Sequence, residues 1–176
     1  MIGFNEIGMM GRLGNQMFQY AALKGIAANR GFEYTIPPDG MLDQIDNYGL
    51  LEAFELTTNK NIGYLNTKLR SRENHFHFDE NVFNKCPDNV SLLGFFQSEK
   101  YFKHIEEDLR KDFTFKENWL EPCKGFRERI NREVIFLHVR RGDPNLADKR
   151  GFKWAYTNLQ STHPVQPLEY YEKALA

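Results

Sequence analysis

The chain has 176 residues, enough for one well-buried domain or for one domain and part of another. A net charge of -1 argues against general binding to nucleic acids, so any positively charged site must be local. The two cysteines have no metal-ligand spacing, and no run approaches the roughly 18 apolar residues that span a bilayer. The N-terminus is too polar for a signal peptide. We therefore expect a cytoplasmic protein.

The first 38 residues have the pattern of a β–α–β unit, the usual opening of a parallel α/β sheet. An apolar strand over Ile2–Met10 precedes a glycine-rich turn. Asn15 is placed to cap a helix over Gln16–Arg30, which Gly31 ends. One face of that helix consists mostly of small residues and can pack close to a sheet: Phe18, Ala21, Ala22, Gly25 and Ala28. A second strand is predicted where apolar and polar residues alternate: Phe32, Tyr34 and Ile36.

The middle of the chain, residues 39–88, has few sustained periods, and we expect short helices and loops there. The segment His75–Phe78 alternates as in a strand with two histidines on one face. A partly exposed strand is favoured over a metal site, because no cysteine or third ligand lies nearby in the sequence.

A regular pattern returns after Val90. Leu92–Phe96 predicts a strand, and Ser98 is placed to cap a helix over Glu99–Asp112. Residues at helical spacing give that helix an apolar stripe, which we expect in the core: Phe102, Ile105 and Leu109. A further amphipathic helix is predicted from Trp119 to about Arg132.

The most informative segment reads V-I-F-L-H-V-R-R-G-D, Val134–Asp143. Its β-branched and aromatic run predicts a buried strand that ends in two arginines. Ligands of open α/β sheets bind at that end of a strand, and guanidinium groups there suit a phosphate. His138 and Arg140 would share one face and grip a diphosphate, while Arg141 faces the other side and can pair with Asp143. A salt-bridged sheet edge without a ligand is the alternative.

The turn before the first helix carries three glycines with the spacing G-x-x-G-x-x-G: Gly8, Gly11 and Gly14. This spacing matches neither the dinucleotide fingerprint nor the P-loop, so a tight strand-to-helix turn is favoured. The helix N-terminus also offers a place for an anion or for sugar hydroxyls, with polar side chains nearby: Arg12, Asn15 and Gln16.

Four segments together resemble glycosyltransferase family 11, the α-1,2-fucosyltransferases. They come in the family's order and span nearly the whole chain: Gly11–Ala21, Gly94–Phe102, His138–Asp143 and Pro167–Leu175. The glycine segment, G-R-L-G-N-Q-M-F-Q-Y-A, and the arginine segment, H-V-R-R-G-D, are the specific ones. The resemblance implies an α/β, GT-B-like fold with Rossmann-type parallel sheets. Residues 1–132 would form an N-terminal Rossmann-like domain on the acceptor side, and residues 133–176 the first strand and helix of an incomplete donor-binding domain.

The resemblance also implies transfer of L-fucose from GDP-β-L-fucose to the 2-hydroxyl of a terminal galactose, with inversion. Arg140 carries over as the catalytic residue on the donor diphosphate, and a metal is not expected because arginines can neutralise the departing GDP. The other residues carried over as substrate-binding ones are His138, Arg141, Asp143, Gly14, Asn15 and Gln16. Asp143 would be a poor general base beside two arginines, so the base is not identified.

Two departures from the family matter. Pro144 stands where family members commonly have tyrosine, and the chain stops inside a final helix over Leu168–Ala176, whereas members continue. The alternative function is therefore a non-catalytic nucleotide-sugar or glycan-binding remnant. A half-built sheet would also expose a strand edge, so self-association is a further expectation. Peripheral association with the inner face of the membrane stays open as well.

Overall fold

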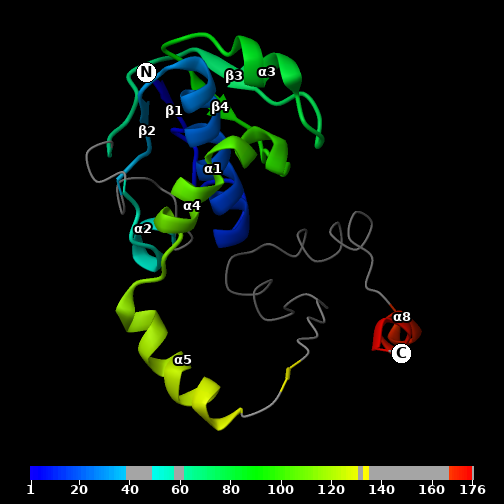
Figure 1. The fold of residues 1–176 in the computed structure, drawn as a ribbon. Helices are drawn as coiled ribbons and strands as arrows, with labels where there is room; N and C mark the ends of the chain where they lie inside the picture. Colours follow the sequence, from blue (N-terminus) through cyan, green and yellow to red (C-terminus); the bar gives the residue numbers. More distant parts are fainter. Residues whose placement is uncertain (39–48, 58–61, 131–132, 135–166, 176) are drawn as a thin grey trace, which may run out of the picture. The chain divides into compact units, whose positions relative to one another are not determined.

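The computed structural model describes residues 1–38, 49–57, 62–130, 133–134 and 167–175 (Figure 1). The chain divides into two units, Met1–Arg129 and Ile130–Ala176, each of which is described by itself. In the second unit, helix α8 covers Leu168–Leu175, as the sequence predicted for the last segment. Within the described ranges, no helix combines the length and apolar character needed to cross a membrane.

The first unit is built on a four-stranded parallel sheet with the strand order β2-β1-β4-β3 (Figure 1). The strands are short: β1 Ile2–Gly3, β2 Tyr34–Thr35, β3 Arg70–Arg72 and β4 Ser91–Leu93. A parallel sheet joined by helical crossovers confirms the predicted α/β class.

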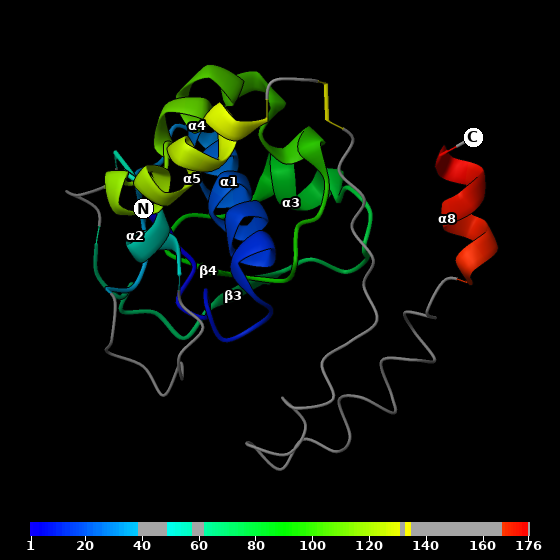
Figure 2. The same cartoon turned by 90° about the horizontal axis from the view of Figure 1, so that it is seen from below.

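The long helix α1, Leu13–Arg30, contacts β1, β2 and most of the other helical segments of this unit. Those elements are short: α2 Leu50–Ala53, α3 Glu80–Lys85, η1 Glu99–Tyr101, η2 Lys103–Ile105, α4 Glu106–Asp112 and α5 Glu117–Arg129. The largest fully buried side chains form one core cluster with α1: Tyr20, Tyr101, Phe4, Phe54 and Phe96. Figure 2 shows α1, α3 and α4 lying on the same side of β3 and β4.

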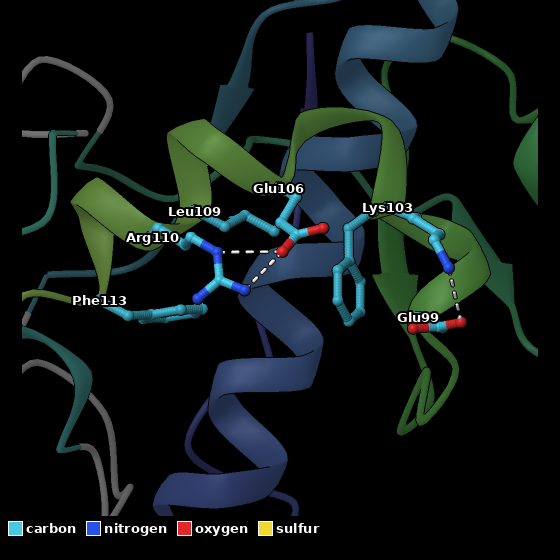
Figure 3. A pocket seen from close by; sticks show the side chains of 7 residues that line it. Glu99, Lys103, Glu106, Leu109, Arg110 and Phe113 are labelled. Atoms are coloured by element: carbon cyan, nitrogen blue, oxygen red, sulfur yellow. Dashed lines mark hydrogen bonds and ion pairs between the residues drawn. The ribbon is translucent and has the colours of Figure 1, made fainter.

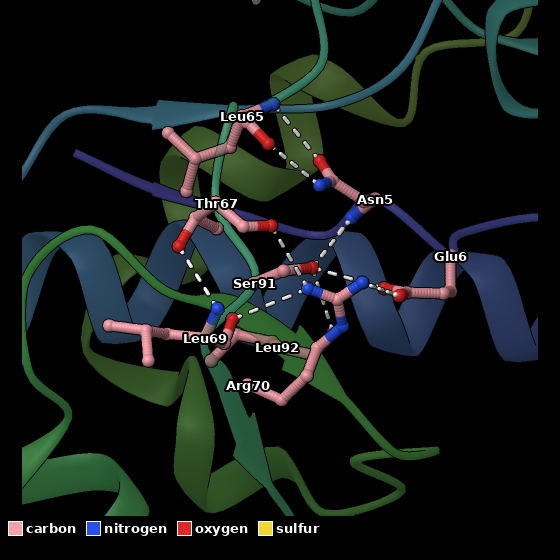
Figure 4. Close-up of polar contacts among 8 residues, drawn as sticks. All are labelled: Asn5, Glu6, Leu65, Thr67, Leu69, Arg70, Ser91 and Leu92. Atoms are coloured by element: carbon pink, nitrogen blue, oxygen red, sulfur yellow. Dashed lines mark hydrogen bonds and ion pairs between the residues drawn. The ribbon is translucent and has the colours of Figure 1, made fainter.

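An extended segment, residues 63–69, covers the face of the sheet toward which Gly3 points. A Cβ atom on Gly3 would lie 2.9 Å from the Cβ atom of Leu65, so the absence of a side chain allows this close approach. The Asn5 side chain fixes the segment by donating to the Leu65 carbonyl at 2.9 Å and accepting from its N–H at 3.0 Å (Figure 4). The segment therefore takes the place that a second helical layer has in a three-layer domain.

The same face carries a small polar network (Figure 4). The Ser91 hydroxyl accepts from the Asn5 backbone N–H and donates to Glu6 Oε2, each at 3.0 Å. The other Glu6 oxygen pairs with the Arg70 guanidinium at 2.7 Å. Residues from β3, β4 and the turn after β1 are thus tied together where the strands are too short to do so alone.

Several boundaries differ from those predicted. β1 ends at Gly3, because the following residues turn and Gly8 and Gly11 adopt positive φ angles of 86° and 83°. Helix α1 begins at Leu13 with Arg12 as its N-cap, so the predicted cap at Asn15 is wrong. Gly31 ends the helix as predicted, with a φ of 67°.

Two other predicted elements are wrong or incomplete. The helix predicted over Glu99–Asp112 is broken into η1, η2 and α4, and Ser98 forms no side-chain cap. The break follows from packing, because a Cβ on Gly25 of α1 would lie 2.1 Å from the Tyr101 carbonyl oxygen. The segment His75–Phe78 is a bend after β3 rather than a strand, with the two histidine rings stacked at 4.7 Å.

Asp112 is a buried carboxylate that joins three parts of the first unit. Its side chain is fully buried and accepts from Lys24 Nζ at 2.5 Å, from the Tyr20 hydroxyl at 2.9 Å and from the Thr57 backbone N–H at 3.0 Å. Burial alone would raise the pKa of Asp112, but the hydrogen bonds from Lys24, Thr57 and Tyr20 outweigh it and hold the pKa below its usual range.

We expect Asp112→Asn to lower the free energy of unfolding at pH 7 by about 3 kcal/mol, because the change leaves Lys24 without its counter-charge. A pKa lowered in the folded state stabilises the protein above the unfolded pKa of about 4. The difference between wild type and variant should therefore shrink as the pH falls below 4. Urea unfolding between pH 3 and pH 7 measures both effects.

The matched control is Asp108→Asn. Asp108 is exposed on the same helix and pairs with Lys111 at 3.7 Å, so its loss should leave the urea midpoint unchanged. Equal midpoints for wild type and Asp112→Asn at pH 7 would contradict the role assigned to Asp112.

Candidate functional site

The residues of the arginine motif lie outside the described part of the chain. His138, Arg140, Arg141 and Asp143 all fall within residues 135–166, so the diphosphate grip stays a prediction. The structure does describe the glycine segment and the loops that follow β1, β3 and β4. Because these strands are parallel, the three loops leave the same edge of the sheet, where ligands of open α/β sheets bind.

A pair of amide side chains lies at this edge. Gln97, which follows β4, donates from Nε2 to Asn15 Oδ1 at 2.6 Å. Asn15 is half-buried in the first turn of α1, and Gln97 is exposed. Side-chain amides offer both donors and acceptors, which is the chemistry that recognises neutral sugar hydroxyls. Of the three sequence-predicted site residues that the structure describes, Asn15 is the one that lies in a polar surface pair.

The position of Asn15 explains the glycine at residue 11. A Cβ on Gly11 would lie 2.1 Å from Asn15 Nδ2, and Gly11 has a φ of 83° that side-chain-bearing residues rarely adopt. The Asn15 side chain therefore occupies the space that a Cβ would need. The turn is tight, as the spacing predicted, and it also seats a polar side chain.

The other two predicted residues of this segment have different surroundings. Gly14 is exposed in the first turn of α1, and a Cβ there would meet no atom of the described residues within 4 Å. Gln16 is fully buried, and its Oε1 accepts from the Gly49 backbone N–H at 3.0 Å. Gln16 thus fixes the start of α2 from inside the protein, whereas Asn15 faces the edge.

Three further residues build this edge and were not predicted from the sequence. Gln97 is one of them, although its position directly after a strand of a parallel sheet could have indicated it. Gln19 is fully buried and donates from Nε2 to the Gly94 carbonyl at 3.0 Å and to the Met10 carbonyl at 3.3 Å. It therefore joins the loop before α1 to the loop after β4. Among the described residues, its Oε1 has no hydrogen-bond partner.

Glu73 is the third residue, and it comes directly after β3. Its side chain is largely buried, and Oε2 accepts from the backbone N–H groups of Phe95 at 3.1 Å and Phe96 at 2.8 Å. Oε1 accepts from the Tyr101 hydroxyl at 3.3 Å. Burial raises the pKa of Glu73, and these three hydrogen bonds only partly oppose that rise. No sequence motif marked Glu73, because its partners are 22 to 28 residues away.

A pocket of about 460 Å³ lies elsewhere, over η1, η2 and α4 (Figure 3). Its lining residues are Glu99, Phe102, Lys103, Glu106, Leu109, Arg110 and Phe113. The charged side chains pair with one another: Lys103 with Glu99 at 3.3 Å and Arg110 with Glu106 at 2.5 Å. This pocket borders a segment that packs on Gly25 of α1. Gly25 comes ten residues after Asn15, which corresponds to about 15 Å along the helix axis. It is therefore separate from the candidate edge.

The described residues give no sign of a metal site. Within those ranges, no group of three or more histidine, cysteine, aspartate or glutamate side chains could hold an ion. His75 and His77 stack on each other beyond β3. The Asn15–Gln97 pair gives the described edge neutral amides that can form hydrogen bonds.

Most of the chain is similar to known proteins. The model of glycosyl transferase family 11 matches residues 1–156. The chain is 28% identical over 143 residues to galactoside alpha-(1,2)-fucosyltransferase 1 of Lagothrix lagotricha, covering 76% of this chain and 37% of the relative. It is 28% identical over 151 residues to galactoside alpha-(1,2)-fucosyltransferase 2 of Sus scrofa, covering 80% and 42%. The chain thus spans about two fifths of the length of these relatives. No solved structure matches it.

We predict that Gly11→Ala displaces the Asn15 side chain and breaks its hydrogen bond with Gln97. The added Cβ meets Asn15 Nδ2 at 2.1 Å, and the positive φ alone costs about 1–2 kcal/mol. The side-chain amide signals of Asn15 and Gln97 in ¹H–¹⁵N NMR spectra should both shift, and the protein should unfold at lower urea concentration.

Gly14→Ala is the control for that experiment. The position is helical and open, so alanine should stabilise the protein by up to about 1 kcal/mol and leave both amide signals in place. If Gly11→Ala behaved like Gly14→Ala, the packing of Asn15 over Gly11 would be wrong.

Proposed function

The chain belongs to glycosyl transferase family 11, and we propose that it serves the transfer of L-fucose from GDP-β-L-fucose to the 2-hydroxyl of a terminal galactose, with inversion. The observation that carries this proposal is the family match over residues 1–156, which includes both the glycine segment and the arginine motif. The two curated relatives are named galactoside alpha-(1,2)-fucosyltransferases, which supports the same donor sugar and linkage.

We place the parts of the reaction on a GT-B-like arrangement of two Rossmann-type halves. Residues 1–132 would provide the acceptor side, and residues 133–176 would begin the donor-binding half. The parallel sheet of the first unit supports this arrangement, since its carboxyl edge gathers Asn15 and Gln97 from separate loops. Neutral amides suit the hydroxyl groups of a galactoside better than they suit a diphosphate.

In the proposed mechanism, Arg140 stabilises the negative charge that develops on GDP as the bond to fucose breaks. The acceptor hydroxyl attacks the anomeric carbon of fucose from the opposite face, which inverts its configuration. His138 would support Arg140 on the same face of its strand, and Asp143 would hold the turn through Arg141. The guanidinium groups supply the positive charge that other glycosyltransferases take from a metal ion, so the proposal includes no metal.

A second candidate function is that of a binding module for a nucleotide sugar or a glycan, without transfer of fucose. The observation that favours it is the Asn15–Gln97 pair, since side-chain amides bind sugar hydroxyls but supply no strong acid or base. The two functions share the same contacts at the sheet edge and at Arg140. They differ in whether a product is formed.

The assay that separates them uses the purified chain with GDP-fucose and lactose. Formation of fucosyl-lactose would establish the transferase. Binding of GDP or lactose without product would support the binding module, and binding of neither would overturn both proposals.

Arg140→Ala tests the residue on which the donor site depends. Loss of one charge-assisted contact of about 1.5–3 kcal/mol should weaken GDP binding by roughly 10- to 150-fold in titration calorimetry. Arg110→Ala is the control, since Arg110 is exposed and pairs with Glu106 far from the sheet edge. Unchanged GDP affinity in Arg140→Ala would remove Arg140 from the donor site.

A further inference from the structure

The loop after β4 has an unusual backbone. Gly94 has a φ of 156°, and Phe96, a bulky residue, has a φ of 53° in the left-handed region. For a residue with a side chain, that conformation costs about 1–2 kcal/mol and persists only where surrounding contacts enforce it. Phe96 is also fully buried, so a change of its backbone conformation would have to move the ring within the core.

Glu73 supplies the contacts that enforce this backbone. One carboxylate oxygen accepts from the N–H groups of two successive residues, Phe95 and Phe96, at 3.1 and 2.8 Å. Hydrogen bonds to a charged group are the stronger kind, about 1.5–3 kcal/mol each, so two of them offset the strain at Phe96. A Cβ on Gly94 would lie 2.7 Å from the Glu73 Cβ, which shows how closely the loop closes over this side chain.

The position of the Glu73 carboxylate is fixed by Tyr101. Its Oε1 accepts from the Tyr101 hydroxyl at 3.3 Å, and that hydroxyl accepts from the Asp79 backbone N–H at 2.7 Å. Tyr101 is fully buried and packs edge-on against Phe96 at 5.2 Å between ring centroids. The carboxylate therefore has one position, set by the core, from which it holds the loop.

We propose that Glu73 is a positioning residue for the acceptor side of the site: it holds the Gly94–Phe96 loop in the strained conformation that sets Gln97 against Asn15. The proposal rests on the proposed function, because it assigns acceptor binding to the Asn15–Gln97 pair. Gln97 follows the strained Phe96 directly, so its direction depends on the backbone there. A loop relaxed at Phe96 would carry the Gln97 amide away from Asn15 Oδ1, which it now meets at 2.6 Å.

Three variants of the full chain test this role. Glu73→Ala removes the acceptor of both N–H groups. Glu73→Gln keeps one side-chain oxygen that can accept from both, so it should restore what alanine loses. Asp112→Asn is the matched control: it also breaks a buried carboxylate network and lowers stability, but its partners, Lys24, Tyr20 and Thr57, are not in the loop.

The readouts are the backbone amides of Phe95 and Phe96, the side-chain amide of Gln97, and titrations with lactose and with GDP, all followed by NMR. In Glu73→Ala we expect at least tenfold faster hydrogen exchange at the two backbone amides, a shifted Gln97 side-chain signal and lactose binding weakened at least tenfold, with GDP binding unchanged. Glu73→Gln should lie near wild type in every readout. Asp112→Asn should leave all of them unchanged at a urea concentration where the protein is folded.

Two results would overturn the proposal. One is an unmoved Gln97 signal in a folded Glu73→Ala protein, and the other is an equal loss of lactose binding in Asp112→Asn, which would reduce Glu73 to a stabilising residue. Failure of the wild-type chain to bind lactose would refute acceptor binding at this edge. The Gln97 signal would then decide separately whether Glu73 holds the loop. If Glu73→Ala does not fold, Glu73→Gln with a displaced Gln97 signal would count against the proposal.

Discussion

The first unit depends on how closely α1 approaches the chain around Tyr101. A Cβ atom on Gly25 would lie only 2.1 Å from the Tyr101 carbonyl oxygen, so any side chain at this position would clash with it. Nine of the residues of α1 are buried, so the helix cannot move outward to make room without losing much of the core. This contact fixes η1, and through Tyr101 it fixes Glu73 and the loop after β4. The geometry at the sheet edge therefore depends on the contact of Gly25, which lies ten residues after Asn15 in α1.

Burial raises the pKa of two carboxylates, but their net pKa shifts have opposite directions, and their partners explain the difference. Asp112 faces the Lys24 ammonium, and that contact together with neutral donors holds its pKa below the usual range. Within the described part of the chain, Glu73 has three hydrogen-bond donors and no paired cation, and Asp79 lies near enough to raise its pKa further. Asp112 thus contributes mainly to stability, whereas Glu73 holds a strained loop with weaker electrostatic support. The position of the Glu73 carboxylate, buried without a paired cation among the described residues, is better explained by the loop geometry that it imposes than by the stability that it adds.

Some parts of this fold are determined by local chemistry, and these could be predicted from the sequence. Gly31 ends α1 because a left-handed residue is needed there, and the apolar runs around β1, β2 and β4 gave the α/β class. The small residues of α1 were recognised, but Gly25 packs on the Tyr101 backbone rather than on the sheet. For the same reason the helix predicted over Glu99–Asp112 is interrupted. Glu73 and Gln97 could not be found from periodicity, since each acts on a partner far away in the sequence.

In the proposed function, the described edge would serve the acceptor and the arginine motif the donor. The donor carries a diphosphate, whose charge calls for guanidinium groups, while the acceptor is neutral and calls for hydrogen-bond donors and acceptors. Under the proposed function the Asn15–Gln97 pair would bind the acceptor. The loop that carries Gln97 is held by the buried Gln19 amide and by the Glu73 carboxylate. Gln19 keeps a buried oxygen without a partner among the described residues, an arrangement that costs about 1–3 kcal/mol and that a side chain chosen only for stability would avoid. The two carbonyl groups that its Nε2 binds lie in two of the loops at this edge, the one after β1 and the one after β4. Gln19 therefore ties these two loops to each other, as Glu73 ties the loop after β4 to the end of β3.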